Sequence, residues 1–123
     1  MDYTQFLSGI VHDVTGPGRV DFGGGELEPA ETDPHPGQKR NEGDDYEWWH
    51  LDAGQYLLKY NESIVGEDMQ FTLQTRQELL ARGAFHPTLQ VTELPRVPLS
   101  VGGEGLRVKE NARISTLVAA EQA

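Results

Sequence analysis

The chain has 123 residues, a length typical of a single folded domain, and we treat residues 1–123 as one domain. Its 20 acidic residues outnumber its 10 basic ones, which gives a formal net charge of −10 and disfavours nucleic-acid binding, because that depends on neutralising phosphates with Lys and Arg. No apolar run approaches the ~20 residues needed to cross a bilayer, and the N-terminus lacks the basic start and apolar stretch of a signal peptide. We therefore expect a cytoplasmic protein that binds neither nucleic acid nor membranes.

The charged residues also bear on the solvent to which the protein is adapted. Only three of the basic residues are lysines, Lys39, Lys59 and Lys109, and the acidic residues are spread along the chain. Such a surface is typical of proteins adapted to molar salt, where screening removes the self-repulsion of a high net charge. The alternative is an ordinary acidic, soluble domain. The chain has no cysteine, which excludes disulfides and thiolate chemistry.

The first part of the chain is rich in turn residues. Residues 19–22 form a strand candidate between two glycine-rich segments, 16–18 and 23–25. We expect 23–25 and a later glycine-rich segment, 102–105, to be turns, because both lack the lysine and the Ser or Thr of a P-loop. Residues 28–45 contain three prolines, two glycines and mostly polar side chains. This composition predicts a long polar surface loop over about 28–45.

The second part of the chain is dominated by strand signals. Residues 69–76 alternate apolar and polar side chains, the period of a half-buried strand. Further strands are predicted at 55–60, 88–92, 98–101, 106–109 and 113–118. One short helix is predicted within TRQELLARGA, residues 75–84, because Leu79 and Leu80 favour helix and Gly83 suits its C-terminal end. The sequence thus predicts a mostly β chain with one short helix, arranged as a compact barrel or sandwich.

The segment TRQELLARGA admits two interpretations. A strand that runs into a helix start presents free N–H groups to an anion, and Arg76 and Arg82 could bind phosphate oxygens. The alternative is a capping box, in which Thr75 caps the helix and the Glu78 side chain bonds back to the Thr75 N–H. In that case the Glu78 carboxylate occupies the place of a phosphate, and both arginines are ordinary surface residues.

The aromatic and histidine residues are less specific. Adjacent Trp48 and Trp49 cannot both face the core of a regular strand, so one of them is expected to cover a partner subunit or a loop, or to offer a stacking surface for a base. The histidines lack the spacing of metal ligands, so we predict no protein-borne metal site. They are His12, His35, His50 and His86.

The order of three segments resembles one known family. WWHLDAGQYLLKYNESI, TRQELLARGA and GLRVKENARISTLV follow one another as corresponding motifs do in the dUTPase and dCTP deaminase superfamily, in its archaeal form. The resemblance covers about residues 46–118. The positions that match are Leu51, Gly54, Tyr56, Glu62, Arg76, Leu79, Arg82, Gly83, Ala112, Arg113 and Ile114. It implies a dUTPase-like distorted β-barrel of the β-clip type and a homotrimer with nucleotide sites between subunits.

The resemblance also implies a chemistry and a set of site residues. Members hydrolyse dUTP to dUMP and pyrophosphate with Mg²⁺ carried by the nucleotide, or deaminate dCTP. The implied substrate-binding residues are Arg76, Gln77, Glu78, Arg82 and Gly83, with Arg76 on the triphosphate. Two departures matter. Gln77 and Glu78 stand where the family motif has serines, and the segment with the family's water-activating aspartate is not found, which leaves Glu93 as the nearest candidate catalytic carboxylate.

Three hypotheses follow. The first is a dUTP nucleotidohydrolase, in which Arg76 neutralises charge and a carboxylate such as Glu93 orients water. The second is a relative that keeps the fold and the trimer but has lost turnover, and that acts as a nucleotide-binding or protein-interaction subunit. The third is a β-rich adaptor with no nucleotide history. Fold alone cannot choose between them.

Overall fold

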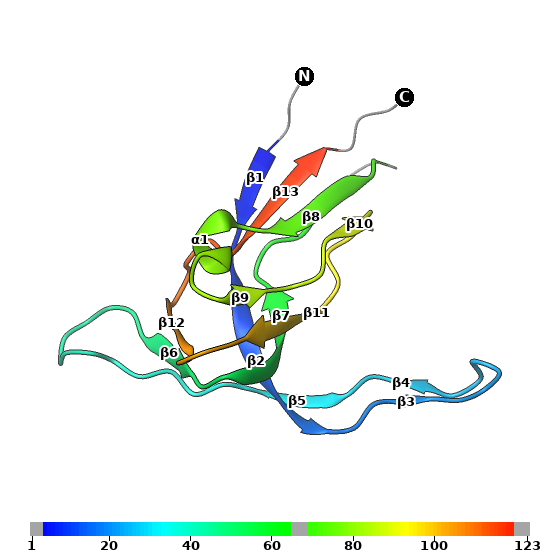
Figure 1. The fold of residues 1–123 in the computed structure, drawn as a ribbon, viewed down its shortest axis with the longest axis horizontal. Helices are drawn as coiled ribbons and strands as arrows, with labels where there is room; N and C mark the ends of the chain where they lie inside the picture. The colour runs from blue at the N-terminus through cyan, green and yellow to red at the C-terminus, as the bar shows by residue number, and fades with distance from the viewer. Residues whose placement is uncertain (1–3, 65–68, 120–123) are drawn as a thin grey trace.

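The computed structural model describes residues 4–64 and 69–119, which form short antiparallel strands and one short helix (Figure 1). The prediction of a mostly β chain with one short helix is confirmed. In chain order the elements are β1 (Thr4–Leu7), β2 (Gly9–Gly16), β3 (Arg19–Val20), β4 (Leu27–Glu28), β5 (Glu31–Pro34), β6 (Trp48–Leu51), β7 (Gly54–Tyr60), β8 (Phe71–Thr75), α1 (Gln77–Leu80), β9 (Ala84–Phe85), β10 (Leu89–Val91), β11 (Val97–Val101), β12 (Leu106–Lys109) and β13 (Ser115–Ala119).

The strands lie in four open sheets. The two larger sheets have the orders β1-β13-β8-β10 and β5-β2-β7-β11-β9, and the two smaller ones pair β12 with β6 and β3 with β4. All named strand pairs are antiparallel. Within the described residues no sheet closes on itself, because each keeps two edge strands, whereas a barrel requires its first and last strands to pair. In place of a closed barrel, the described residues form open sheets that share one hydrophobic core.

The core follows from the strand period of two. In β11, Val97, Leu99 and Val101 are buried, and the residues between them are not. In β8, Phe71 and Leu73 point to the same core. Burying each of these side chains contributes about 1.5–3 kcal/mol. The fully buried apolar residues come from both large sheets: Leu7, Val11, Leu58, Leu73, Val97, Leu99 and Leu117.

Strand assignments differ most in the first half of the chain. Every predicted strand overlaps an observed one, and β5 lies inside the predicted loop 28–45. The strands that were not expected are β1, β2, β4, β5, β6 and β9. The sequence of β5, ETDP, has no apolar period because β5 is an exposed edge strand, which among the described strands pairs with β2 alone. Pro34, at its end, is tolerated there since an edge position needs no N–H on its open side.

A short arm lies outside the core. The predicted turn at 23–25 is confirmed, and it joins β3 to β4 at the tip of an arm that projects from the body at the lower right of Figure 1. In the described part of the chain, no helix has both the length and the apolar character needed to span a membrane.

Candidate functional site

The predicted capping box is wrong. Residue Arg76, not Thr75, is the N-cap of α1, and its side chain makes no capping bond. The Thr75 hydroxyl instead donates to the carbonyl of His86 at 3.0 Å and accepts the His86 N–H at 2.9 Å. Thr75 ends β8, so its hydroxyl stays with the sheet and bonds to the segment after β9, out of reach of the helix start.

Arg76 is held by its own chain. Its guanidinium donates to Glu78 Oε1 at 3.0 Å and to the carbonyl oxygen of Arg113 at 3.3 Å. The same group lies over the Phe6 ring, 4.4 Å from its centroid, within the range of a cation–π contact. Glu78 therefore does place a carboxylate beside Arg76, as one interpretation of the sequence required, but through an ion pair and not through a capping box.

The structure brings the two predicted arginines together at Glu78. Arg82 donates to the Glu78 carbonyl oxygen at 2.8 Å, while Arg76 pairs with the Glu78 carboxylate. Gln77 is exposed beside them. Gly83 ends the helical segment with φ +82 and donates its N–H to the Leu80 carbonyl oxygen at 3.1 Å, in accord with its expected role. The five predicted substrate-binding residues thus form one cluster.

Glu93 does not join this cluster. It lies exposed after β10, and the pairing of Val91 with Phe71 puts it beyond the first residue of β8. Arg76 follows the last residue of β8, Thr75. At about 3.4 Å per residue, the two side chains start roughly 20 Å apart along the strand. Within one chain Glu93 cannot orient water at a phosphate held by Arg76; it could do so only across a subunit contact.

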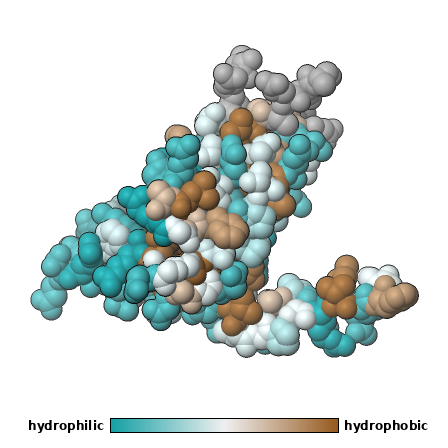
Figure 2. Space-filling model, viewed as in Figure 1, coloured by the Kyte–Doolittle hydropathy of each residue, from teal (hydrophilic) through white to brown (hydrophobic). Residues whose placement is uncertain are grey.

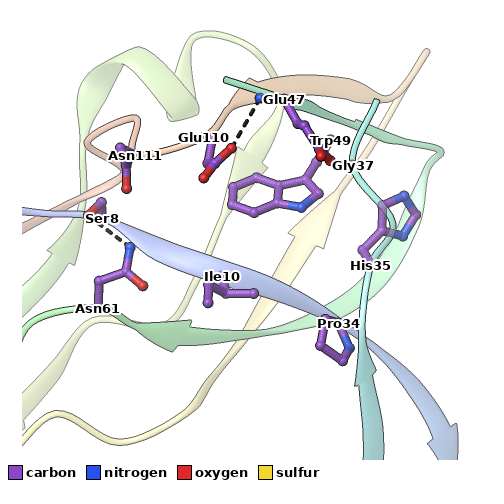
Figure 3. Close-up of a pocket in the computed structure, with 10 residues that line it drawn as sticks. All are labelled: Ser8, Ile10, Pro34, His35, Gly37, Glu47, Trp49, Asn61, Glu110 and Asn111. Atoms are coloured by element: carbon purple, nitrogen blue, oxygen red, sulfur yellow. Dashed lines mark hydrogen bonds between the residues drawn. The ribbon is translucent and has the colours of Figure 1, made fainter. Parts of the chain in front are cut away.

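A separate groove lies between β2, β6 and the loop before β6 (Figure 3). It has a volume of about 410 Å³ and is lined by Ser8, Ile10, Pro34, His35, Gly37, Glu47, Trp49, Asn61, Glu110 and Asn111. The Trp49 indole occupies its centre in Figure 3. Glu110 Oε1 accepts the Glu47 N–H at 3.1 Å, so both residues meet at the rim. The lining contains two carboxylates and neither Lys nor Arg, which makes the groove unsuitable for a triphosphate.

One side of this groove is fixed by Glu62. Its two carboxylate oxygens each accept the Ser8 N–H at 3.0 Å, and Oε2 also accepts the Ser8 hydroxyl at 3.0 Å. Asn61 donates to the same hydroxyl at 3.2 Å. Glu62 is thus engaged in joining the end of β7 to the β1–β2 junction, a structural use of a position that the sequence resemblance had also singled out.

A buried polar network was not predicted. The Ser115 hydroxyl lies 2.7 Å from both Tyr60 Oη and His86 Nε2, and His86 Nδ1 lies 2.8 Å from the Pro87 carbonyl oxygen. A carbonyl only accepts, so Nδ1 carries the hydrogen, Nε2 accepts from Ser115, and Tyr60 donates to Ser115. Burial lowers the pKa of His86 and raises the pKa of Tyr60 to about 12.

This network resembles a nucleophile and base only in its distances. Ser115 is fully buried, and His86 and Tyr60 are also buried, so no substrate reaches the Ser115 hydroxyl. The group therefore ties β7, β13 and the segment after β9 together. Sequence alone could not reveal it, because 29 residues separate His86 from Ser115 and only the fold joins them.

The prediction that the two tryptophans do not both face the core is confirmed. Trp49 is buried in the core, whereas Trp48 is half-buried under the guanidinium of Arg40, 4.6 Å from the ring centroid. Trp48 thus covers the loop before β6. Among the described residues, no group of three or more His, Asp or Glu side chains could hold a metal ion.

Comparison with family models, with curated proteins and with solved structures gives no match for this chain. The function is therefore inferred from the geometry of the chain's own residues.

Proposed function

We propose that this chain is a dUTPase-like protein that has lost nucleotide turnover and acts as a protein-interaction subunit in a homotrimer. The observation that carries the proposal is the 3.0 Å ion pair between Arg76 and Glu78. The arginine that would neutralise a triphosphate is already neutralised, and Glu78 would repel the incoming charge. The groove around Trp49 supports the same conclusion, since its two carboxylates disfavour anions and suit neutral or cationic groups of a partner.

Nucleotide titration tests this proposal. We expect the wild type to bind dUTP weakly and to release no pyrophosphate at molar KCl with Mg²⁺. Replacing Gln77 and Glu78 together by serine removes the carboxylate beside Arg76 and should tighten dUTP binding about tenfold or more. Adding Arg76→Ala to that double variant should remove the gain.

A matched control separates local from general charge effects. Glu110→Gln removes one exposed carboxylate at the groove rim, away from Arg76. It should leave dUTP affinity unchanged, whereas a general reduction of negative charge would help both variants equally. Pyrophosphate release by the wild type would overturn the proposal and favour the hydrolase.

A dUTP nucleotidohydrolase is the second candidate, and one observation favours it. Arg76 and Arg82 both contact Glu78, so displacing that carboxylate would leave two guanidinium groups close together, as a phosphate clamp requires. The described side chains offer no metal site of their own, so Mg²⁺ would have to arrive on the nucleotide.

Deamination of dCTP is tested in the same assay by measuring ammonia. Loss of turnover in Glu93→Gln would identify its carboxylate as the catalytic one.

A further inference from the structure

The β3–β4 arm has two unlike faces. Arg19 lies opposite Glu28, and Val20 lies opposite Leu27. Since side chains alternate along a strand, the first pair shares one face and the second pair shares the other. Arg19 is satisfied by Glu26 at 2.9 Å and Glu28 at 3.8 Å. The opposite face has no such partner, and Val20 and Leu27 are 81% and 65% exposed.

The tip of the arm adds a third apolar side chain. Phe22 is fully exposed, although the turn around it has a defined shape: Asp21 accepts the Gly25 N–H at 2.6 Å and donates its own N–H to the Glu26 carbonyl oxygen at 3.0 Å. Figure 2 shows the brown side chains of the arm standing clear of the body. A two-stranded hairpin is marginal in water by itself, and an uncovered apolar patch marks an interaction surface.

A second apolar surface lies beside α1. A groove of about 370 Å³ is lined by Leu80, Phe85 and Pro87 together with polar side chains that include Gln74 and Thr88. Leu80 and Phe85 are each just over half exposed. As far as the described residues form its lining, this groove has no Asp, Glu, Lys or Arg. Figure 2 shows brown and tan side chains in this region, around α1 and β9.

Charge distinguishes the two grooves as receptors for the arm. The arm carries three carboxylates, on Asp21, Glu26 and Glu28, and one guanidinium, on Arg19, and therefore has a net charge of −2. The groove around Trp49 has two carboxylates at its rim and would repel it. The described lining of the groove beside α1 has none, and the exposed Arg82 lies two residues after the end of α1.

We propose that the arm of one copy inserts Phe22 into the groove between α1 and β9 of a second copy. One chain carries both an uncovered apolar arm and an uncovered apolar groove, and self-association covers both at once. The contact joins two different surfaces, so successive copies form a ring where the rotation closes. It rests on the proposed function in one respect, since it supplies a contact for the proposed homotrimer, but it holds whether or not the chain hydrolyses nucleotides.

Salt should strengthen this association. Two copies each carry a net charge of −10, so they repel one another until ions screen the charge. We expect the wild type to be an oligomer at about 2 M KCl and to dissociate toward about 0.1 M KCl, as followed by sedimentation or light scattering.

Substitutions separate the arm from other surfaces. Phe22→Ser and Phe85→Ser should each weaken association about tenfold or more, since each removes an aromatic side chain from the contact. Tyr46→Ser, an exposed aromatic in the loop before β6, should leave association unchanged. Phe22→Ser should also leave thermal unfolding of the monomer unchanged, because Phe22 is fully exposed in the described part of the chain.

The absence of cysteine makes disulfide trapping specific. We expect Phe22→Cys mixed with Phe85→Cys to form a reducible heterodimer, and Phe22→Cys mixed with Tyr46→Cys to form far less. A wild type that stays monomeric at both salt concentrations would overturn the proposal. So would an oligomer unaffected by Phe22→Ser, or linking to residue 46 equal to linking to residue 85.

Discussion

Removing the Ser115 hydroxyl should destabilise the fold strongly for so small a change. Ser115→Ala deletes two hydrogen bonds of 2.7 Å, to Tyr60 and His86, at a fully buried position. Each bond contributes about 1 kcal/mol net, and a buried polar group left without a partner costs about 1–3 kcal/mol. Tyr60 Oη lies 3.4 Å from His86 Nε2, so in the variant these two atoms can bond to each other and offset part of the loss. We expect a loss of about 2–3 kcal/mol, or about 10 °C in Tm for a chain of this length.

Urea unfolding followed by tryptophan fluorescence at fixed salt measures this loss. Ser100→Ala is the matched control, because the Ser100 hydroxyl accepts a bond of 2.8 Å from Gln55 at the surface. It should cost less than about 0.5 kcal/mol. If Ser115→Ala costs no more than Ser100→Ala, the buried network does not hold the sheets together and the reasoning is refuted.

Three other predictions concern pH and backbone conformation. Burial lowers the pKa of His86 from 6.5. The stability that depends on neutral His86 is therefore complete above pH 6.5 and is lost as the pH falls below 6.5, by up to about 1.4 kcal/mol per pH unit. Below pH 6.5, the urea midpoint of His86→Gln should depend less on pH than that of the wild type. Burial raises the pKa of Tyr60 from 10 to about 12. The stability that depends on the neutral Tyr60 hydroxyl is present below pH 10 and is lost as the pH rises to 12, by about 3 kcal/mol in total. In Tyr60→Phe this loss at alkaline pH should be absent. Gly105→Ala should lower the free energy of unfolding by about 2–3 kcal/mol, because φ is +90 and the new Cβ would collide with the Leu51 carbonyl oxygen. Gly103 is the control, with φ +59 and open space around it. In thermal unfolding, Gly103→Ala should lower the midpoint by less than half as much as Gly105→Ala does.

The second half of the fold was predictable because its strands bury one face. The alternation in residues 69–76 appears as β8, with Phe71 and Leu73 buried, and the Gly83 position ends the helix as expected. The first half was not, since β2 and β5 are held by pairing across the sheet and not by an apolar period. Strand pairing between distant segments leaves no local signal in the sequence.

The candidate site was predictable in its members but not in its contacts. TRQELLARGA does bring Arg76, Glu78 and Arg82 together. Arg82 follows Glu78 by four residues, the spacing at which helical residues are neighbours, whereas Arg76 is the N-cap and reaches the Glu78 carboxylate from the helix start. The capping box failed because the local pattern competed with a tertiary partner: Thr75 bonds to His86, eleven residues later. The groove around Trp49 was missed because its residues come from separate segments between Ser8 and Asn111.

The Arg76–Glu78 pair and the uncovered arm predict different effects of salt on nucleotide binding and on self-association. Arg76 is only partly exposed, with its ring contact on Phe6 and its carbonyl contact on Arg113. A phosphate would have to displace Glu78 while those contacts hold the guanidinium in place, and that competition disfavours binding at any salt concentration. The apolar arm has no such competitor, and screening of the net charge of −10 only favours its burial. Rising salt should therefore strengthen self-association, while competition from Glu78 keeps nucleotide binding weak throughout. Measuring dUTP affinity and oligomer size along one KCl series would place the two tendencies on a single axis, and a parallel rise of both would contradict the argument.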